Sequence, residues 1–192
     1  MAERAHPEDP GFKGNSIYKK KMMERYEWAN QYIHNKDVLD IPCGCGWGTY
    51  CLTGYKSCIG IDIDAPSIEY AERCFKKTNC EFMVWDMANF RPQFSCEQFD
   101  VIVCLEGYEH IEQKKGILFL EQAKILLRPG GLLLLTCPVI PLRGKHSGNP
   151  YHLYEPNEID FIMIVNSRFR ILSAEWQPFP DNPIYRVVLQ RR

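Results

Sequence analysis

The sequence has no apolar run close to the roughly 20 residues that a helix needs to span a bilayer. Its first residues, MAERAHPEDPGFKG, are charged and contain proline, so they lack the apolar core of a secretion signal. We therefore expect a cytoplasmic protein that does not contact membranes, with a flexible segment over residues 1–14.

An excess of charge of either sign is also missing, since 23 basic residues stand against 24 acidic ones. No bulk positive field is available to attract nucleic acid, which argues against a nucleic-acid partner. We expect the short basic run at 18–25 to form the exposed face of a helix.

Cysteine is plentiful, with nine residues, but the spacing C-x-x-C that zinc ribbons and fingers use is absent. Thiols in a cytoplasmic chain stay reduced. We therefore expect free thiols that fill the core as small apolar residues, rather than disulfides or a metal cluster.

Apolar runs alternate with helical patterns along the chain. The runs predict strands at 37–41, 58–63, 80–86, 99–106 and 132–138. Helical spacing and caps predict helices at 15–34, from 47 onward, at 65–77, at 111–127 and at 156–165, with the RPGG of 128–131 ending the fourth. Such alternation is typical of parallel βαβ units in an open α/β sheet. Two β-rich runs at the end, 169–177 and 184–190, leave no room for a helix and predict an antiparallel hairpin at one sheet edge. We expect one domain over 15–192.

The stretch VLDIPCGCGWGTYCL (38–52) places glycines at 44, 46 and 48 directly after the first strand. Glycine permits a tight turn and a close ligand approach, and the helix that follows offers unpaired N–H groups. Asp62 ends the second strand, where a carboxylate can accept hydrogen bonds from ribose hydroxyls. Together these features predict an adenosine-nucleoside site.

Two common nucleotide fingerprints are absent. The dinucleotide pattern G-x-G-x-x-G would need glycine at 49, which is threonine, and no G-K-[ST] follows the glycines. Asp40, at the end of the first strand, would repel a pyrophosphate but suits the ammonium of an amino-acid moiety or the backbone N–H groups of the loop. The pattern thus disfavours a nicotinamide oxidoreductase.

Several segments in this order resemble class I S-adenosylmethionine-dependent methyltransferases: ERYEWA (24–29), VLDIPCGCGWGT (38–49), IGIDI (59–63), WDM (85–87), FDVIVCLEGYEHI (99–111), LLRPGG (126–131) and NPYHLYEPNEI (149–159). The resemblance covers about residues 22–175. It implies a seven-stranded Rossmann-like sandwich, an α/β fold with a mostly parallel sheet and a C-terminal antiparallel β-hairpin. It also implies S-adenosyl-L-methionine as cofactor.

The same resemblance implies roles for individual residues. The cofactor would be bound by Asp40, Gly44, Gly46 and Gly48 at its methionine end, Asp62 at the ribose, Ile63 against adenine, Asp86 at the adenine amine with Met87 beside it, backbone of Leu105 near the sulfonium, and Tyr26 closing over the pocket. Pro42-Cys43 departs from the glycine or small residue common in the pattern, which implies a change in loop stiffness rather than chemistry. Cys43, Cys45 and Cys51 would then lie in or beside the nucleoside loop and hold no metal.

Three histidines are candidate catalytic residues on the acceptor side. His110 follows the fourth strand, and His146 and His152 lie in the long irregular segment 137–155, a kind of segment that is usually functional. A hydroxyl acceptor needs a base with a pKa near neutrality, which histidine provides. The alternatives are ordinary loop hydrogen bonding, or a divalent metal on these histidines with Glu106 or Glu109; we expect no metal. Residues 155–158 should simply start a helix.

The pattern HSGNPYHLYEPNEI (146–159) resembles methyltransferases that modify glycans or small metabolites. We therefore expect methyl transfer to a polar small-molecule acceptor, as O-methylation of a sugar or metabolite, by a monomer or homodimer. Two alternatives stay open: a non-catalytic cofactor-binding protein that acts as a regulator or partner, and a methyltransferase acting on a protein or nucleic acid.

Overall fold

The computed structural model describes residues 16–89, 94–140, 148–177 and 184–192. The expected flexible segment 1–14 and the candidate base His146 lie outside these ranges. The chain divides after Met87 into two compact units.

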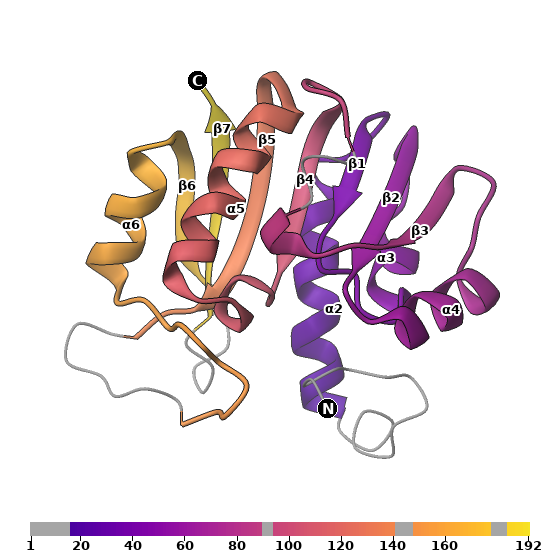
Figure 1. The fold of residues 1–192 in the computed structure, drawn as a ribbon, viewed down its shortest axis with the longest axis horizontal. Helices are drawn as coiled ribbons and strands as arrows, with labels where there is room; N and C mark the ends of the chain where they lie inside the picture. The colour runs from indigo at the N-terminus through magenta and orange to yellow at the C-terminus, as the bar shows by residue number, and fades with distance from the viewer. Residues whose placement is uncertain (1–15, 90–93, 141–147, 178–183) are drawn as a thin grey trace. The chain divides into compact units, whose positions relative to one another are not determined.

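Over its described residues, the first unit combines parallel strands with α-helices (Figure 1). Its elements are α2 (Ser16–Asn30), β1 (Asp37–Asp40), α3 (Trp47–Cys51), β2 (Ser57–Asp62), α4 (Ala65–Cys74) and β3 (Cys80–Val84). The strand order is β3-β2-β1, with Asp40 opposite Gly60 and Asp62 opposite Val84. Because parallel strands end at the same edge, Asp40 and Asp62 both lie at the carboxyl edge of this sheet.

Local signals explain where α4 begins. Asp64 is its N-cap, with its carboxylate accepting a hydrogen bond from the Ser67 backbone N–H at 3.0 Å, and Pro66 lies in the first turn, where a missing N–H costs nothing. Ile68 and Ala71 form the buried face of the helix.

The second unit begins with Ala88 and contains β4 (Phe99–Leu105), a 3₁₀ turn η3 (Tyr108–His110), α5 (Gln113–Leu126), β5 (Leu127–Pro138), α6 (Glu158–Asn166), β6 (Phe169–Trp176) and β7 (Ile184–Arg191). A further 3₁₀ turn, η1 (Met87–Asn89), lies at the division. β4 and β5 are parallel, whereas β7 is antiparallel to both β5 and β6. β4 is almost entirely buried, and β5 is buried throughout from Leu133 to Pro138, as a strand covered on both faces should be. The seven strands and the antiparallel C-terminal pair confirm the expected α/β fold class.

The predicted start of β5 is wrong. The strand expected at 132 begins at Leu127, directly after α5, so the RPGG segment lies within β5. The pairing with β4 passes from Phe99–Leu127 to Val101–Leu132, which leaves 128–131 as an insertion in the ladder. Proline and glycine were interpreted as a break between elements, but here they form an irregularity inside a strand.

All nine cysteines lie within the described residues and are free thiols, and six of them are buried, as expected.

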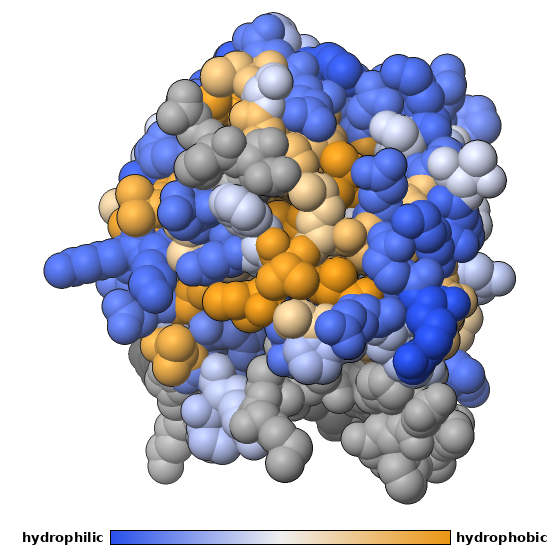
Figure 2. All heavy atoms as spheres, turned by 45° about the vertical axis from the view of Figure 1, so that its right-hand side comes forward, coloured by the Kyte–Doolittle hydropathy of each residue, from blue (hydrophilic) through white to orange (hydrophobic). Residues whose placement is uncertain are grey.

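Within the described ranges, no helix has the length and apolar character that crossing a bilayer requires. Figure 2 shows an apolar area among hydrophilic residues on one face of the molecule.

Candidate active site

The glycine loop connects β1 to α3 and is fixed to β2 by its backbone. The Cys43 N–H donates to the Ile61 carbonyl at 2.8 Å, and the Gly46 N–H donates to the Cys43 carbonyl at 3.1 Å. Gly46 has φ 82°, and a Cβ there would meet the Ala71 Cβ at 2.6 Å, so both its conformation and its packing require glycine.

Gly44 differs from Gly46 in its surroundings. Its φ is +55°, which also favours glycine, but a Cβ at Gly44 would meet no atom of the described residues within 4 Å. The loop is therefore tightly packed on its inner side at Gly46 and open at Gly44. A ligand can approach the backbone at that point.

Tyr26 from α2 packs against the third glycine. A Cβ at Gly48 would lie 2.0 Å from the Tyr26 ring, and the Tyr26 ring meets the Trp47 ring edge-on at 5.4 Å between centroids. The side chain is buried, and this burial raises the pKa of the Tyr26 phenol well above its usual value. Tyr26 thus packs directly onto the start of α3, beside the loop; its role toward a cofactor stays a prediction.

Asp62 joins the loop to the end of β2. One of its carboxylate oxygens accepts the Gly44 N–H at 2.9 Å, and the other accepts the Asp64 N–H at 2.9 Å. The residue is buried. Because each carboxylate oxygen can accept more than one hydrogen bond, these contacts leave capacity for ribose hydroxyls.

Asp40 is fully buried beneath the loop. Its Oδ2 accepts a hydrogen bond from the Thr49 hydroxyl at 2.6 Å, while its buried Oδ1 has no hydrogen-bond partner among the described residues. Burial raises the pKa of Asp40 to about 7; the Thr49 hydrogen bond lowers it and the charge of Asp62 raises it further. A buried carboxyl with one unused oxygen suits a donor or cation supplied by a ligand.

Thr49 has a role that sequence reasoning missed. The pattern marked it only as the residue standing where a dinucleotide fingerprint has glycine. In the structure its buried side chain is the hydrogen-bond donor to Asp40.

The carboxyl ends of β2 and β3 carry apolar and acidic side chains that fit the expected adenine contacts. Ile63 is 64% exposed and Val84 is 46% exposed, so apolar surface is available beside the paired positions Asp62 and Val84. Asp86 is half-buried and Met87 is buried.

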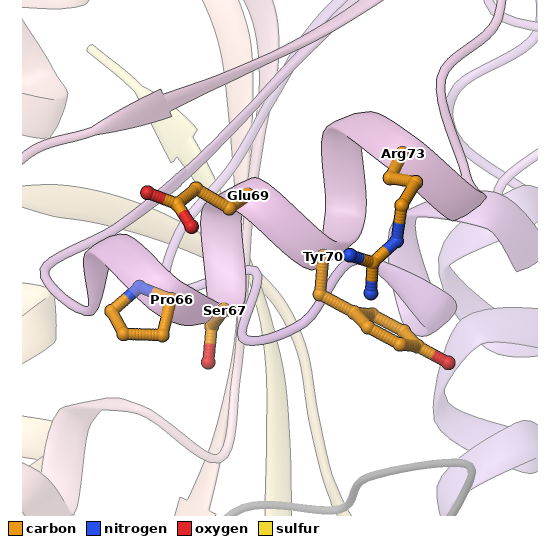
Figure 3. Close-up of a pocket in the computed structure, with 5 residues that line it drawn as sticks. All are labelled: Pro66, Ser67, Glu69, Tyr70 and Arg73. Carbon is orange, nitrogen blue, oxygen red and sulfur yellow. The ribbon is translucent and has the colours of Figure 1, made fainter.

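A shallow hollow of about 240 Å³ lies on α4. It is lined by Pro66, Ser67, Glu69, Tyr70 and Arg73, all from one helix (Figure 3). None of the predicted cofactor residues lines it. We therefore assign the candidate cofactor site to the glycine loop, not to this hollow.

In the second unit, the residues after β4 are held in place by hydrogen bonds. Leu105, the predicted backbone contact to the sulfonium, is the last residue of β4 and is buried. Glu106 follows with φ 54°, and its carboxylate accepts the Thr136 hydroxyl at 2.9 Å. The Leu153 and Tyr154 N–H groups both donate to the Glu109 carbonyl, at 2.8 and 3.1 Å. These bonds fix the segment 149–157 against η3.

The same contacts bring two of the three candidate histidines together. The rings of His110 and His152 have centroids 5.3 Å apart. The His110 Nδ1 lies 3.0 Å from the Tyr151 carbonyl oxygen, and the His152 Nδ1 bonds the Glu155 carboxylate. His146 falls in 141–147, outside the described residues.

Glu155 corrects a prediction. It was expected only to start a helix, but α6 begins at Glu158 with Asn157 as its N-cap. Glu155 is instead 5% exposed and orients His152. Its neighbours in sequence are those of a helix start, so no local signal distinguishes it.

Comparison with known proteins agrees with this geometry. Residues 38–131 match the family model described as a methyltransferase domain. The chain is 32% identical over 110 residues to phthiotriol/phenolphthiotriol dimycocerosates methyltransferase 1 of Mycobacterium ulcerans, covering 54% of this chain and 38% of that protein. It is 28% identical over 120 residues to a ubiquinone biosynthesis O-methyltransferase of Paraburkholderia phytofirmans, covering 58% and 49%. The chain thus spans less than half the length of these curated relatives.

The fold has a close counterpart among solved structures. The N-methyltransferase NodS of Bradyrhizobium japonicum WM9, in complex with S-adenosyl-L-homocysteine, superposes with a TM-score of 0.76 at 16% identity, covering 97% of this chain and 93% of that one. The family match over residues 38–131 and the shared fold confirm the resemblance to class I S-adenosylmethionine-dependent methyltransferases that the motifs predict.

Proposed function

We propose that this protein transfers a methyl group from S-adenosyl-L-methionine to a hydroxyl of a polar small molecule, such as a sugar or another metabolite. The observation that carries the proposal is the open backbone at Gly44, which lies beside the buried carboxylate of Asp62. The unused oxygen of Asp40 supports it as well. These features fit a ligand with ribose hydroxyls and an ammonium group.

The residues that would hold the cofactor are those that the family resemblance implies. In the first unit they are Tyr26, Asp40, Gly44, Gly46, Gly48, Asp62, Ile63, Asp86 and Met87, and in the second unit Leu105. When bound, S-adenosyl-L-methionine supplies an electrophilic methyl group on a positively charged sulfur. The chain's own task is to align the acceptor and exclude water.

The acceptor oxygen must lose a proton as it is methylated. We assign the promotion of this loss to His110, His146 and His152. For the two described histidines, the hydrogen bonds of His110 to the Tyr151 carbonyl and of His152 to the Glu155 carboxylate support the assignment, because a catalytic imidazole needs a fixed orientation.

The class of acceptor rests on weaker support. The names of two relatives, a ubiquinone biosynthesis O-methyltransferase and a phthiotriol methyltransferase, favour a small-molecule acceptor and, for the first, oxygen as the methylated atom. The choice of a sugar rests on the pattern at 146–159. A single domain over 15–192, a cytoplasmic location and a monomeric or homodimeric state belong to the same proposal.

Calorimetry tests the cofactor assignment. S-adenosylmethionine and its demethylated product should bind, NAD should not, and Asp62→Ala should lose most of the affinity for the product. Asp100 of β4 is half-buried and paired with Arg128 at 2.8 Å, and it is not part of the predicted site, so Asp100→Ala is the matched control. Tight NAD binding would overturn the assignment.

Incubation with methyl-labelled cofactor and a metabolite extract tests catalysis. Label should move to a small molecule, and His110→Ala, His146→Ala or His152→Ala should lower turnover without changing affinity for the demethylated product. The exposed His34 provides the control variant His34→Ala. If the protein binds cofactor but no extract accepts label, it is a non-catalytic regulator; label in protein or nucleic acid would favour a macromolecular acceptor.

A further inference from the structure

Three potential metal ligands meet where the segment 149–157 packs on η3. Glu109, His110 and His152 each place one ligand atom so that all three atoms lie within 4.8 Å of one another. Glu109 is 1% exposed, and the two histidines are half-buried. These residues come from two segments that are 42 positions apart or more in the chain, and backbone hydrogen bonds from Leu153 and Tyr154 to the Glu109 carbonyl hold them together.

The hydrogen bonds of the two imidazoles determine which nitrogen atoms carry protons. His110 Nδ1 faces the Tyr151 carbonyl oxygen at 3.0 Å, and a carbonyl can only accept, so Nδ1 carries the hydrogen. His152 Nδ1 faces the Glu155 carboxylate in the same way. At His152 Nε2, the Asn149 amide nitrogen lies 3.0 Å away and donates. Each neutral ring therefore presents the lone pair of its Nε2.

This is the arrangement by which proteins prepare histidine to bind a metal. A ligating histidine almost always donates its other ring N–H to a carboxylate or a backbone carbonyl, which fixes the tautomer and the ring orientation. Here one ring has the carboxylate partner and the other has the carbonyl partner. The donor set of two imidazoles and one carboxylate suits divalent ions such as zinc, manganese and iron and leaves further coordination positions open.

β5 packs against η3, and acidic side chains lie around its buried Cys137. Burial raises the pKa of the Cys137 thiol well above its usual value, and the carboxylates of Glu109, Glu106 and Glu155 raise it further. Three carboxylates thus act on one buried thiol of β5. A divalent cation nearby would offset this concentration of charge.

We propose that Glu109, His110 and His152 bind a divalent metal ion, with Glu155 as the residue that orients His152. The ion takes the place of the Asn149 amide at His152 Nε2. Binding of the ion stands independently of any activity. Its role rests on the proposed function: the ion would coordinate the acceptor hydroxyl and lower its pKa, so that the proton passes to bulk water and the two histidines promote proton loss as metal ligands. The acceptor oxygen would then form its bond to the methyl carbon as the bond from that carbon to the cofactor sulfur breaks, with S-adenosylhomocysteine as the product.

Manganese is the probe that separates this site from the nine thiols. Thiolates compete strongly for zinc, whereas imidazole and carboxylate suit manganese. The full chain, freed of metal by a chelator and kept reduced, is titrated with Mn²⁺ in the absence of cofactor, and electron paramagnetic resonance measures free ion. We expect one saturable site per chain, and pulsed measurements should detect coupling of the bound ion to imidazole nitrogen.

Substitutions then locate the ion. His152→Ala and Glu109→Gln should each weaken Mn²⁺ binding at least tenfold, and Glu155→Gln should weaken it by about 10- to 100-fold, the range for residues that orient metal ligands. His34→Ala, which removes an exposed histidine elsewhere, should leave binding unchanged.

The outcomes are distinct. No saturable binding at millimolar Mn²⁺, bound ion without nitrogen coupling in the unsubstituted protein, or equal affinity in all variants would overturn the proposal. The nitrogen coupling is measured on the unsubstituted protein, so it tests the metal site even if a substitution prevents folding. Calorimetry of S-adenosylhomocysteine on the same samples tests the cofactor site separately. A protein that binds Mn²⁺ but not S-adenosylhomocysteine would refute the proposed function, and a protein that binds S-adenosylhomocysteine but not Mn²⁺ would refute the metal site.

Discussion

Asp40 should make the stability of this protein fall as the pH rises, and Asp40→Asn should remove that dependence. The carboxyl is fully buried, and its pKa is raised from 3.8 to about 7, mainly by burial. In the unfolded chain the same group titrates near its ordinary value. Asparagine keeps an oxygen that can accept the Thr49 hydroxyl but has no charge to bury.

The sign follows from proton binding. Between about pH 4 and pH 7 the folded protein holds a proton on Asp40 that the unfolded chain has released, so raising the pH favours unfolding. Each pH unit in that window changes the free energy by about 1.4 kcal/mol. Between pH 5 and pH 8, only the part below the folded pKa of about 7 contributes, which is about two pH units. Asp40 should therefore cost about 2 to 3 kcal/mol of stability over this range.

Urea unfolding of the two proteins at pH 5, 6, 7 and 8 measures the effect. The contributions of all other groups cancel when the free energy of unfolding of the natural protein is subtracted from that of Asp40→Asn. This difference should rise by about 2 to 3 kcal/mol between pH 5 and pH 8, in favour of the variant. A difference that stays flat across the series would refute the argument, because it would mean that Asp40 has the same pKa in both states.

Two further sets of substitutions probe the loop. Gly48→Ala should lower the free energy of unfolding by about 1 to 3 kcal/mol, because its Cβ would lie 2.0 Å from the Tyr26 ring. Gly44→Ala should cost only about 1 kcal/mol, for its φ of +55°, but should lower the affinity for S-adenosylhomocysteine at least tenfold; an unchanged affinity by calorimetry would contradict a ligand at Gly44. Thr49→Val should cost about 1 to 3 kcal/mol and raise the pKa of Asp40 further, since it removes the donor at 2.6 Å. The exposed Thr53→Val is its control in the same urea series, and equal losses in both would refute this role.

Much of the fold could be predicted because buried strands leave a clear trace in the sequence. The runs at 58–63 and 99–106 are nearly continuous in apolar residues, and both form strands within one or two residues of the expected bounds. The predicted start of β5 was wrong because proline and glycine, as at 128–131, usually end helices and strands. Here the neighbouring strand β4 resumes pairing beyond them, and local patterns carry no information about such pairing.

The candidate site was predictable only in part, for a related reason. Glycines and an acid at fixed places after strands carry their own signal, and Asp62 does lie beside Gly44. The partners Thr49 and Glu155 carry none, because their roles arise from contacts that exist only once the loop and the segment 149–157 are folded. Glutamate is common at helix starts, so the sequence around Glu155 does not indicate that its side chain is buried against a histidine.

The bond between Thr49 and Asp40 has a consequence for how such a loop can change its ligand during evolution. Replacing Thr49 by glycine would restore the spacing of a dinucleotide fingerprint, yet it would remove the hydroxyl that satisfies a buried acid. The same acid would then face the pyrophosphate. A switch of cofactor therefore needs positions 40 and 49 to change together, because a change at Thr49 alone lowers stability and leaves the acid in place.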